Sequence, residues 1–432
     1  MSTPKILAHN ASKGRMSFPE WGFLLTVFAV AALVIFTRRP DAFTNPQFYF
    51  EDGIFYGNAH EWGVLKALTT PYRGYFVTVQ RLCEWFAQLF PLRFGPLVVI
   101  SCAVVFQVQP AVLICSSRFA HVLPDRRLRI LVALLYLAVP NSWTTISSLA
   151  HTHYHLAALA CFVLLAQPAG RLFCRIFDVL VLLLSGLSGP FAIFLTPIAA
   201  AAWWRDRSRW RLAHVLILAL TAATQLLTIV LAGTGTQGAR PALGASISGF
   251  FSVWTKQVVY GAFVGQRGLE WIFNAGKTIW VEPSVLITFG SIALAILVLA
   301  AIRGPFELRM VQFMAASIFV TALAWPPPQA MTITYWESIS YPGAGNRYFL
   351  LSIFVLGISC AWLLRERKAA LQVVGALALL GLTIGIALDW KQPALRDYDF
   401  ARYVRKYEDA KPGEKVQIPY PPNWGLTLTK KE

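Results

Sequence analysis

The stretch VLITFGSIALAILVLAAI, from Val285 to Ile302, contains eighteen consecutive residues and no charged side chain. An α-helix rises about 1.5 Å per residue, so such a stretch is almost long enough to cross the ~30 Å hydrocarbon core of a bilayer. Similar apolar runs cover Trp21 to Thr37, Gly95 to Ser117 and Leu371 to Leu388. These runs predict helices that cross a membrane.

The composition of the whole chain also favours a membrane protein. Of its 432 residues, 56% are hydrophobic and 14% are charged, whereas soluble domains carry roughly 25% charged residues. In lipid, only helices and closed barrels satisfy the backbone hydrogen bonds, and barrel strands would give short alternating segments instead of continuous apolar runs. The sequence therefore predicts an all-α polytopic membrane protein.

The formal net charge of +17 does not indicate a nucleic-acid partner. Basic residues occur in short segments between the apolar runs, as from Trp203 to Arg211, where arginines and tryptophans stand together. That pattern is typical of a membrane interface, so we expect contact with the lipid bilayer and no nucleic acid. The six cysteines are scattered without a Cys-x-x-Cys pair and predict neither a metal site nor a disulfide framework.

Basic residues also set the expected topology, because short segments rich in Lys and Arg stay in the cytoplasm. Lys5, Lys13 and Arg15 predict a cytoplasmic N-terminus. Five later inward ends are basic in turn, at Arg118 to Arg129, Arg171 to Arg175, Arg205 to Arg211, Arg303 to Arg309 and Arg365 to Lys368. We expect about eleven transmembrane helices in one domain over residues 1–388. Residues 38–94 then form the first extracytoplasmic loop and residues 389–432 a short extracytoplasmic tail, and the composition suits a bacterial inner membrane.

An acidic pair is the sharpest feature of the first loop. Glu51 and Asp52 stand in Phe48-Tyr-Phe-Glu-Asp-Gly53, among aromatic residues and before a glycine. Two carboxyl groups that lie close together and partly out of water titrate in a coupled way at raised pH, which suits a general base or a cation ligand. A solvated pair of loop acids is the simpler alternative.

Arginines beside tyrosines are the second feature of the outer segments. In Pro71-Tyr-Arg-Gly-Tyr75 they are Tyr72, Arg73 and Tyr75, followed by Arg81, and near residue 350 they are Arg347 and Tyr348. A guanidinium group can bind a phosphate through two parallel hydrogen bonds, while tyrosine rings cover a sugar. Each arginine can equally be an anchor at the membrane surface.

Three histidines alternate with other residues in Ala150-His-Thr-His-Tyr-His155. In an extended turn the rings of His151, His153 and His155 would share one side. At the start of a helix, His151 and His155 would align as a pair able to bind a metal. No neighbouring acid completes such a site, so polar packing at the interface is the simpler interpretation.

Taken in order, these segments resemble the GT-C superfamily of membrane glycosyltransferases, in particular its less characterised bacterial members. The likeness rests on Glu51-Asp52-Gly53, Pro71 to Tyr75 with Arg81, His151 to His155, Leu187 to Phe191, Arg347-Tyr-Phe349 and Ile418 to Trp424. No single segment is specific, and their order along nearly the whole chain carries the likeness. The chain departs from the pattern at Thr152-His-Tyr154, where an Asn-x-His-Trp type of string is expected, and at Arg73, where a small or polar residue is commoner.

The resemblance implies a GT-C-like fold and an inverting glycosyltransferase. Its donor would be a polyprenyl-phosphate sugar and its acceptor an envelope glycan such as lipopolysaccharide O-antigen. The base would be Asp52 or Glu51, with Asp52 preferred. Donor phosphate would be bound by Arg81, Arg347 and Arg73, and substrate by Tyr72, Tyr75, His153, His155 and Tyr348. Some relatives need a divalent cation and others do not, so a cation stays open as a cofactor and no metal ligand is assigned.

A transporter or flippase of lipid-linked sugars is the alternative from another class. Inverted repeats and charges in the middle of spans would favour it. The sequence shows neither, apart from Asp178 near an inner end. The longer segments lie on the outer side, which favours the enzyme.

Overall fold

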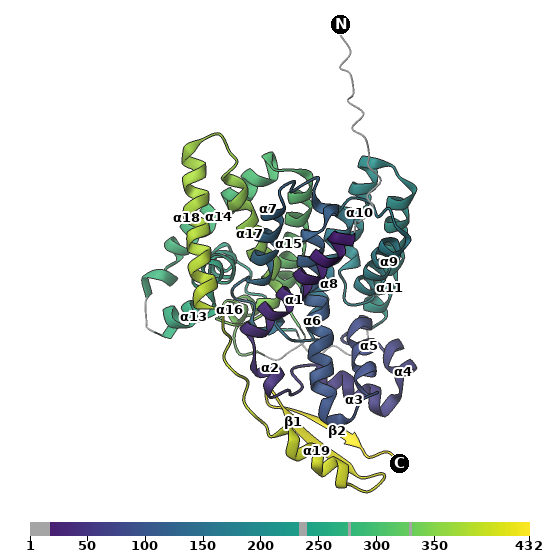
Figure 1. Cartoon of the computed structure of the whole chain (residues 1–432). Coiled ribbons are helices and arrows are strands. Elements are labelled where there is room, and N and C mark those ends of the chain that lie inside the picture. Colours follow the sequence, from purple (N-terminus) through teal and green to yellow (C-terminus); the bar gives the residue numbers. More distant parts are fainter. Residues whose placement is uncertain (1–17, 233–239, 275–277, 328–330) are drawn as a thin grey trace.

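The computed structural model describes residues 18–232, 240–274, 278–327 and 331–432. The structure is mostly helical, with 71% of the described residues in helices, and Figure 1 shows the long helices running side by side. Lys5, Lys13 and Arg15, on which the expected cytoplasmic N-terminus depends, lie outside the described residues.

Six helices within the described residues are long and apolar enough to cross a membrane. They are α1 (Phe18–Arg38), α6 (Gly95–Cys115), α11 (Arg209–Ala232), α14 (Pro283–Arg303), α15 (Phe306–Ala324) and α18 (Ala369–Leu388). Their outer faces carry large apolar side chains, such as Leu220 and Leu377, whose exposed fractions are 70% and 63%. Such faces suit lipid, because an apolar side chain there needs no cover from a neighbouring helix.

Five further helices cover segments that the sequence predicts as spans, but they contain only 12 to 15 residues. They are α7 (Arg126–Leu137), α8 (Thr152–Leu165), α9 (Leu172–Gly186), α10 (Ala192–Asp206) and α17 (Leu350–Leu363). Every residue of α8 is buried. A helix enclosed by protein contacts no lipid, so the bilayer thickness does not set its length. The number of about eleven spans therefore stays a prediction beyond the six long helices.

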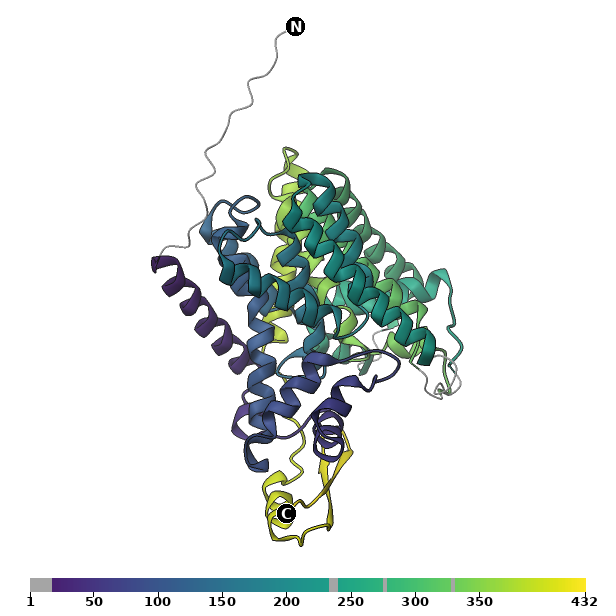
Figure 2. The same ribbon diagram turned by 90° about the vertical axis from the view of Figure 1, so that its right-hand side faces the viewer.

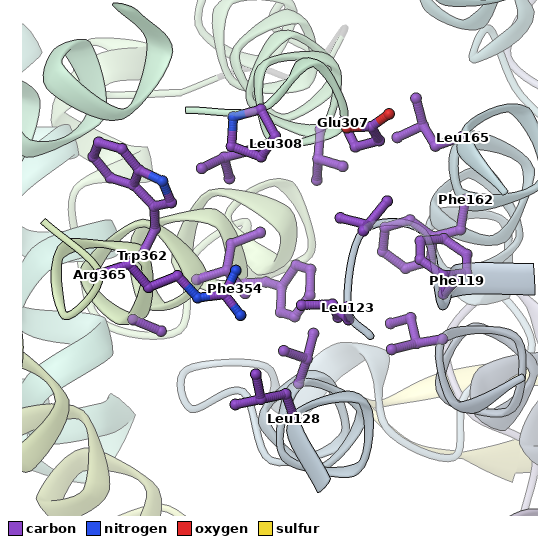
Figure 3. A pocket seen from close by; sticks show the side chains of 17 residues that line it. Phe119, Leu123, Leu128, Phe162, Leu165, Glu307, Leu308, Phe354, Trp362 and Arg365 are labelled. Carbon is purple, nitrogen blue, oxygen red and sulfur yellow. The ribbon is translucent and has the colours of Figure 1, made fainter. Parts of the chain in front are cut away.

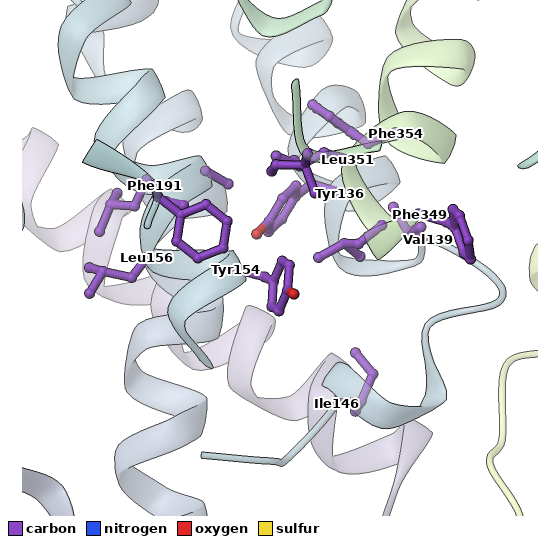
Figure 4. Close-up of a cluster of buried hydrophobic side chains, with 14 of the residues drawn as sticks. Tyr136, Val139, Ile146, Tyr154, Leu156, Phe191, Phe349, Leu351 and Phe354 are labelled. Atoms are coloured by element: carbon purple, nitrogen blue, oxygen red, sulfur yellow. The ribbon is translucent and has the colours of Figure 1, made fainter. Parts of the chain in front are cut away.

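The core of the bundle surrounds α8, which packs against α6, α9, α10 and α15. Aromatic rings meet here at steep angles, as for Tyr136 and Phe354, whose ring centres lie 5.4 Å apart at 88°. This edge-to-face geometry places the positive edge of one ring on the negative face of the other. Figure 4 shows this cluster, to which Tyr154 and Phe191 contribute as well.

Short elements gather at one end of the bundle, which we call the hairpin end (Figures 1 and 2). In the first loop they are α2 (Asp41–Thr44), α3 (Asp52–Trp62), α4 (Val64–Thr69), α5 (Thr78–Ala87) and η1 (Leu92–Phe94). In the tail they are α19 (Phe400–Asp409), β1 (Lys415–Tyr420) and β2 (Trp424–Thr429). The first loop and the tail contact each other, because β2 packs on α3.

The tail corrects the purely helical expectation. Strands β1 and β2 form an antiparallel pair in which Ile418 lies opposite Leu426. Every second side chain of β1, namely Val416, Ile418 and Tyr420, is buried, as the alternation of a strand with one covered face requires. The alternation covers only six residues, so it is a weak signal in a sequence dominated by long apolar runs.

Ion pairs join the helix turns at the opposite end. Arg118 binds both carboxylate oxygens of the buried Asp178, at 2.7 and 2.8 Å. Arg205 lies 3.2 Å from Glu307, and Arg303 lies 3.4 Å from Glu366. Three of the basic segments that the sequence assigns to inward ends therefore contact one another, namely Arg205 to Arg211, Arg303 to Arg309 and Arg365 to Lys368.

The other described elements connect the long helices. They are η2 (Ser117–Phe119), η3 (Trp143–Thr145), α12 (Ile247–Val253), the π-helix η4 (Trp254–Tyr260), α13 (Gly261–Asn274), η5 (Thr278–Val281), α16 (Tyr335–Ile339) and η6 (Asn346–Tyr348). Two of them, η3 and η6, lie side by side and carry residues that position the site described next.

Candidate functional site

A polar cavity of about 60 Å³ lies where the first loop meets the start of α8 and η6. Its lining consists of Glu51, Phe55, Tyr72, Arg73, Tyr75, Val77, Gln80, Ala150, His151, His153, Tyr154, Arg347 and Tyr348. Seven of the ten site residues predicted from the sequence are among them: Glu51, Tyr72, Arg73, Tyr75, His153, Arg347 and Tyr348. Asp52, Arg81 and His155 are not.

The two acids of the first loop point to different places. Glu51 lines the cavity, where its Oε1 lies 3.7 Å from Nη2 of Arg73. Asp52 is only 1% exposed, and its Oδ1 accepts a hydrogen bond of 2.7 Å from the backbone N–H of Ala150. Successive residues of a helical turn point about 100° apart, so the start of α3 separates the pair.

Burial raises the pKa of Asp52 well above its ordinary value, against the opposing effect of the Ala150 hydrogen bond. A carboxyl group out of water favours its neutral form, because the charged form loses its hydration. Asp52 therefore fastens α3 to the turn before α8, and Glu51 is the carboxyl group that reaches the cavity.

A tight turn aims Arg73 at the cavity. Tyr72 and Tyr75 pair through backbone hydrogen bonds of 2.8 and 3.2 Å. Between them, Arg73 and Gly74 have φ of 51° and 90°. Positive φ at both central residues is typical of the two-residue turn that joins antiparallel segments, and Gly74 takes it without a Cβ clash.

Arg347 enters the cavity from η6. Its Nη2 donates to the hydroxyl of Tyr348 at 3.0 Å, and its guanidinium group lies 4.5 Å from the centre of that ring. The preceding residue, Asn346, is fully buried and is held on both sides, accepting from Thr144 Oγ1 and donating to Gln266 Oε1. These two hydrogen bonds of Asn346 fix the backbone position from which the Arg347 side chain extends.

Arg81, predicted to bind phosphate, lies behind the lining. Its exposed fraction is 2%, and its guanidinium group stacks on Phe55 with 4.8 Å to the ring centre. Phe55 separates Arg81 from the cavity that Phe55 itself lines. Arg81 therefore supports an aromatic wall of the site.

His155 also lies away from the cavity. Its Nδ1 is 2.7 Å from the hydroxyl of Tyr136, within the core cluster. Nδ1 of His151 instead lies 2.9 Å from the Thr144 carbonyl oxygen, so the two Nδ1 atoms have different partners. Among the described residues no three His, Cys, Asp or Glu side chains are placed to hold a metal ion.

Some lining residues had little or no signal in the sequence. Phe55, Gln80 and Tyr154 belong to the cavity but were not predicted. Tyr154 stands inside the histidine string and Phe55 one helical turn after Glu51, so their spacing could have suggested them. Gln80 has no such signal, because its role depends on a contact with His153, 73 residues away in the chain.

A second cavity, of about 170 Å³, lies near the opposite end between α7, α15 and α17. Figure 3 shows it surrounded by apolar side chains such as Phe119, Leu308 and Phe354, with Glu307 and Arg365 as its charged members. It offers a hydrocarbon lining and lacks the clustered polar groups of the first cavity.

No family model matches the sequence, and no curated protein matches it either. The polar cavity itself is therefore the basis for inferring a function. It combines two guanidinium groups, one carboxylate, two imidazoles and four tyrosines. Such a set can bind an anion that also carries hydroxyl groups, with a carboxylate ready to accept a proton.

Proposed function

We propose that this chain is a membrane glycosyltransferase. It moves a sugar from a polyprenyl-phosphate donor to a glycan acceptor of the cell envelope, such as lipopolysaccharide O-antigen. The observation that carries the proposal is the convergence of Glu51 with Arg73 and Arg347 in one polar cavity at the end of an apolar helical bundle. An enzyme with a lipid-linked substrate needs both parts, because the lipid keeps its donor in the bilayer.

Glu51 is the base in this proposal. It takes the proton of the acceptor hydroxyl while the hydroxyl oxygen attacks the anomeric carbon of the donor. The bond from that carbon to the phosphate oxygen breaks, the oxygen leaves with both electrons, and the anomeric carbon inverts. Asp52, which the sequence favoured, is buried and already engaged with Ala150, so it acts as a positioning residue.

Arg347 and Arg73 neutralise the leaving phosphate. Negative charge grows on the phosphate as the bond breaks, and fixed guanidinium groups stabilise that charge without reorganising. The cavity, at about 60 Å³, suits a phosphate group. We infer that the phosphate enters it and that the sugar lies at its mouth, against the tyrosine rings.

The finer topology belongs to the same proposal. About eleven spans, with the N-terminus in the cytoplasm of a bacterial cell, make the hairpin end extracytoplasmic. The contact among the basic turns at the opposite end supports this orientation. The cavity then faces the compartment in which envelope glycans are assembled.

The proposal is tested by analysing the envelope glycans of cells that lack this chain and produce wild type, Glu51→Gln or Asp52→Asn at equal levels. We expect one sugar to be missing without the chain and with Glu51→Gln, and to be restored by wild type. Glu408→Gln, which changes an exposed acid of α19, is the matched control. Normal glycans with Glu51→Gln would overturn the assignment of Glu51 as the base. Normal glycans in both loop variants would overturn the enzyme mechanism and favour a transporter or flippase of lipid-linked sugars.

A further inference from the structure

Two histidines of the cavity have their protons on different nitrogens. Nδ1 of His151 lies 2.9 Å from the carbonyl oxygen of Thr144. A carbonyl oxygen only accepts hydrogen bonds, so Nδ1 carries the ring proton. Nε2 of His151 is then an unprotonated nitrogen with a free lone pair.

His153 has the opposite arrangement. Its Nδ1 lies 2.6 Å from Nε2 of Gln80, and the same Gln80 atom is 3.3 Å from the carbonyl oxygen of Ala150. Because that carbonyl can only accept, the Gln80 atom must be the amide nitrogen and not the oxygen. The Ala150 carbonyl also faces the His153 ring, but the Gln80 N–H lies at 2.6 Å and points to Nδ1 as the acceptor, which places the ring proton on Nε2.

Both outer nitrogens are available to a ligand. No residue in the described part of the chain bonds Nε2 of His151 or of His153, and neither atom is among the fully buried unpaired ones, in contrast to Nε2 of His155. Burial and the charge of Arg347 hold the pKa of His151 well below its ordinary value, so this ring stays neutral near pH 7. The cavity thus offers an acceptor at His151 and a donor at His153.

We propose that His151 Nε2 accepts a hydrogen bond from a ligand hydroxyl while His153 Nε2–H donates to an oxygen of the same ligand. The pair selects a hydroxyl-bearing phosphate ester over a phosphate ester without hydroxyls. This inference rests on the proposed function, since it gives the sugar portion of the substrate its contacts. Arg347 and Arg73 bind the phosphate, and the two histidines form hydrogen bonds with the hydroxyl groups beside it.

Thr144 joins the two halves of this recognition. Its carbonyl oxygen fixes the His151 ring, and its hydroxyl donates to Asn346, the residue before Arg347. The acceptor nitrogen and the guanidinium group therefore have a common support. A ligand that spans them meets a preformed spacing, which lowers the ordering cost of binding.

The first test is a nitrogen NMR spectrum of ¹⁵N-histidine-labelled full-length protein in lipid nanodiscs. The signals of His151 and His153 are identified by their loss in His151→Asn and His153→Asn. We expect unprotonated Nε2 in His151 and unprotonated Nδ1 in His153. The reverse tautomers, or a doubly protonated His151 at pH 7, would overturn the proposal.

The second test compares two probes of similar size, glycerol 1-phosphate and propyl phosphate, by titration of the same labelled protein. We expect wild type to bind glycerol 1-phosphate about 3- to 10-fold more tightly, the worth of one or two net hydrogen bonds. His151→Asn keeps a side-chain N–H for Thr144 and removes Nε2, so it should lose most of the preference for glycerol 1-phosphate. His151→Gln, which can place an amide where Nε2 lies, should keep part of the preference.

Equal binding of both probes by wild type, or an unchanged preference in His151→Asn, would contradict the proposal. Failure of both probes to bind would overturn it together with the phosphate role of Arg347. Because binding is measured without sugar transfer, the preference can hold even where Glu51→Gln leaves envelope glycans normal. The two proposals therefore fail separately.

Discussion

Oδ1 of Asp52 accepts a hydrogen bond from the backbone N–H of Ala150, 98 residues further along the chain, at 2.7 Å. This contact ties the start of α3 to the turn that carries His151. Glu51, one residue earlier, stays free to face the cavity and Arg73. The two acids therefore have separate roles: Asp52 holds α3 against the turn before α8, and Glu51 lines the cavity.

Asp52→Asn should therefore preserve the fold, because the amide oxygen can still accept from Ala150. Asp52→Ala leaves a buried N–H without a partner and should cost about 1–3 kcal/mol. Thermal unfolding of the purified proteins in detergent measures both. An Asp52→Asn protein as unstable as Asp52→Ala would show that the charge, and not the accepted hydrogen bond, holds α3 in place.

Glu84 should make stability depend on pH. It is fully buried in α5, and neither carboxylate oxygen has a hydrogen-bond partner among the described residues. Burial, and then the nearby Asp52, raise its pKa well above the ordinary value. An acid whose pKa is raised by folding stabilises the folded state fully at pH values below its unfolded pKa of about 4.3. That contribution to the stability of the fold is lost as the pH rises toward the folded pKa.

Wild type should thus become less stable as the pH rises above about 4.3, and Glu84→Gln should flatten that dependence. Unfolding temperatures across the pH range measure the slope. Asp52 contributes a slope of the same sign, so Glu84→Gln should reduce the dependence without abolishing it. Glu408→Gln, at an exposed site, should retain the wild-type slope. A Glu84→Gln slope equal to that of wild type would show that Glu84 is ionised in the folded protein.

The fold could be predicted where the hydropathy along the sequence determines it. Uncharged runs such as Val285 to Ile302 form long helices, because in lipid a helix is one of the few structures that satisfy the backbone hydrogen bonds. The hairpin could not be predicted, because Lys415 to Tyr420 alternates over only six residues and the strands depend on α19, which packs on β1, and on α3, which packs on β2. The short length of α8 could not be predicted either, because it depends on how the other helices enclose α8.

The candidate site was predictable as residue types and less so as positions. Arginines beside tyrosines at two distant segments came together around one cavity, as for Arg73 and Arg347. Sequence could not separate Glu51 from Asp52, because the contact that occupies Asp52 comes from Ala150. It could not place Arg81 either, since the direction of a helical side chain depends on what the helix packs against.

Gly53→Ala should loosen the tail from the first loop. Gly53 sits under the ring of Tyr420, and an added Cβ would overlap that ring. Such overpacking costs typically about 1–3 kcal/mol, so we expect lower stability and faster trypsin cleavage near Lys411 and Lys415. Gly22→Ala in α1 is the control, because its Cβ would meet open space. Equal cleavage rates in Gly53→Ala and wild type would show that the hairpin does not depend on this close approach.

Arg347→Gln should abolish most sugar transfer while leaving the fold intact. The guanidinium group lines the cavity and contacts Tyr348, whereas the anchoring of η6 belongs to Asn346. Loss of one fixed donor to a developing negative charge typically lowers the rate about 100- to 1,000-fold. Arg347→Lys keeps the charge but not the paired N–H groups, so its rate should fall between those of Arg347→Gln and wild type.

Incorporation of the missing sugar in membrane vesicles at equal protein level measures the rates, with the exposed Arg402→Gln as control. If Arg347→Gln and Arg402→Gln transfer equally well, Arg347 does not contact the leaving phosphate, and the anion must bind elsewhere in the chain.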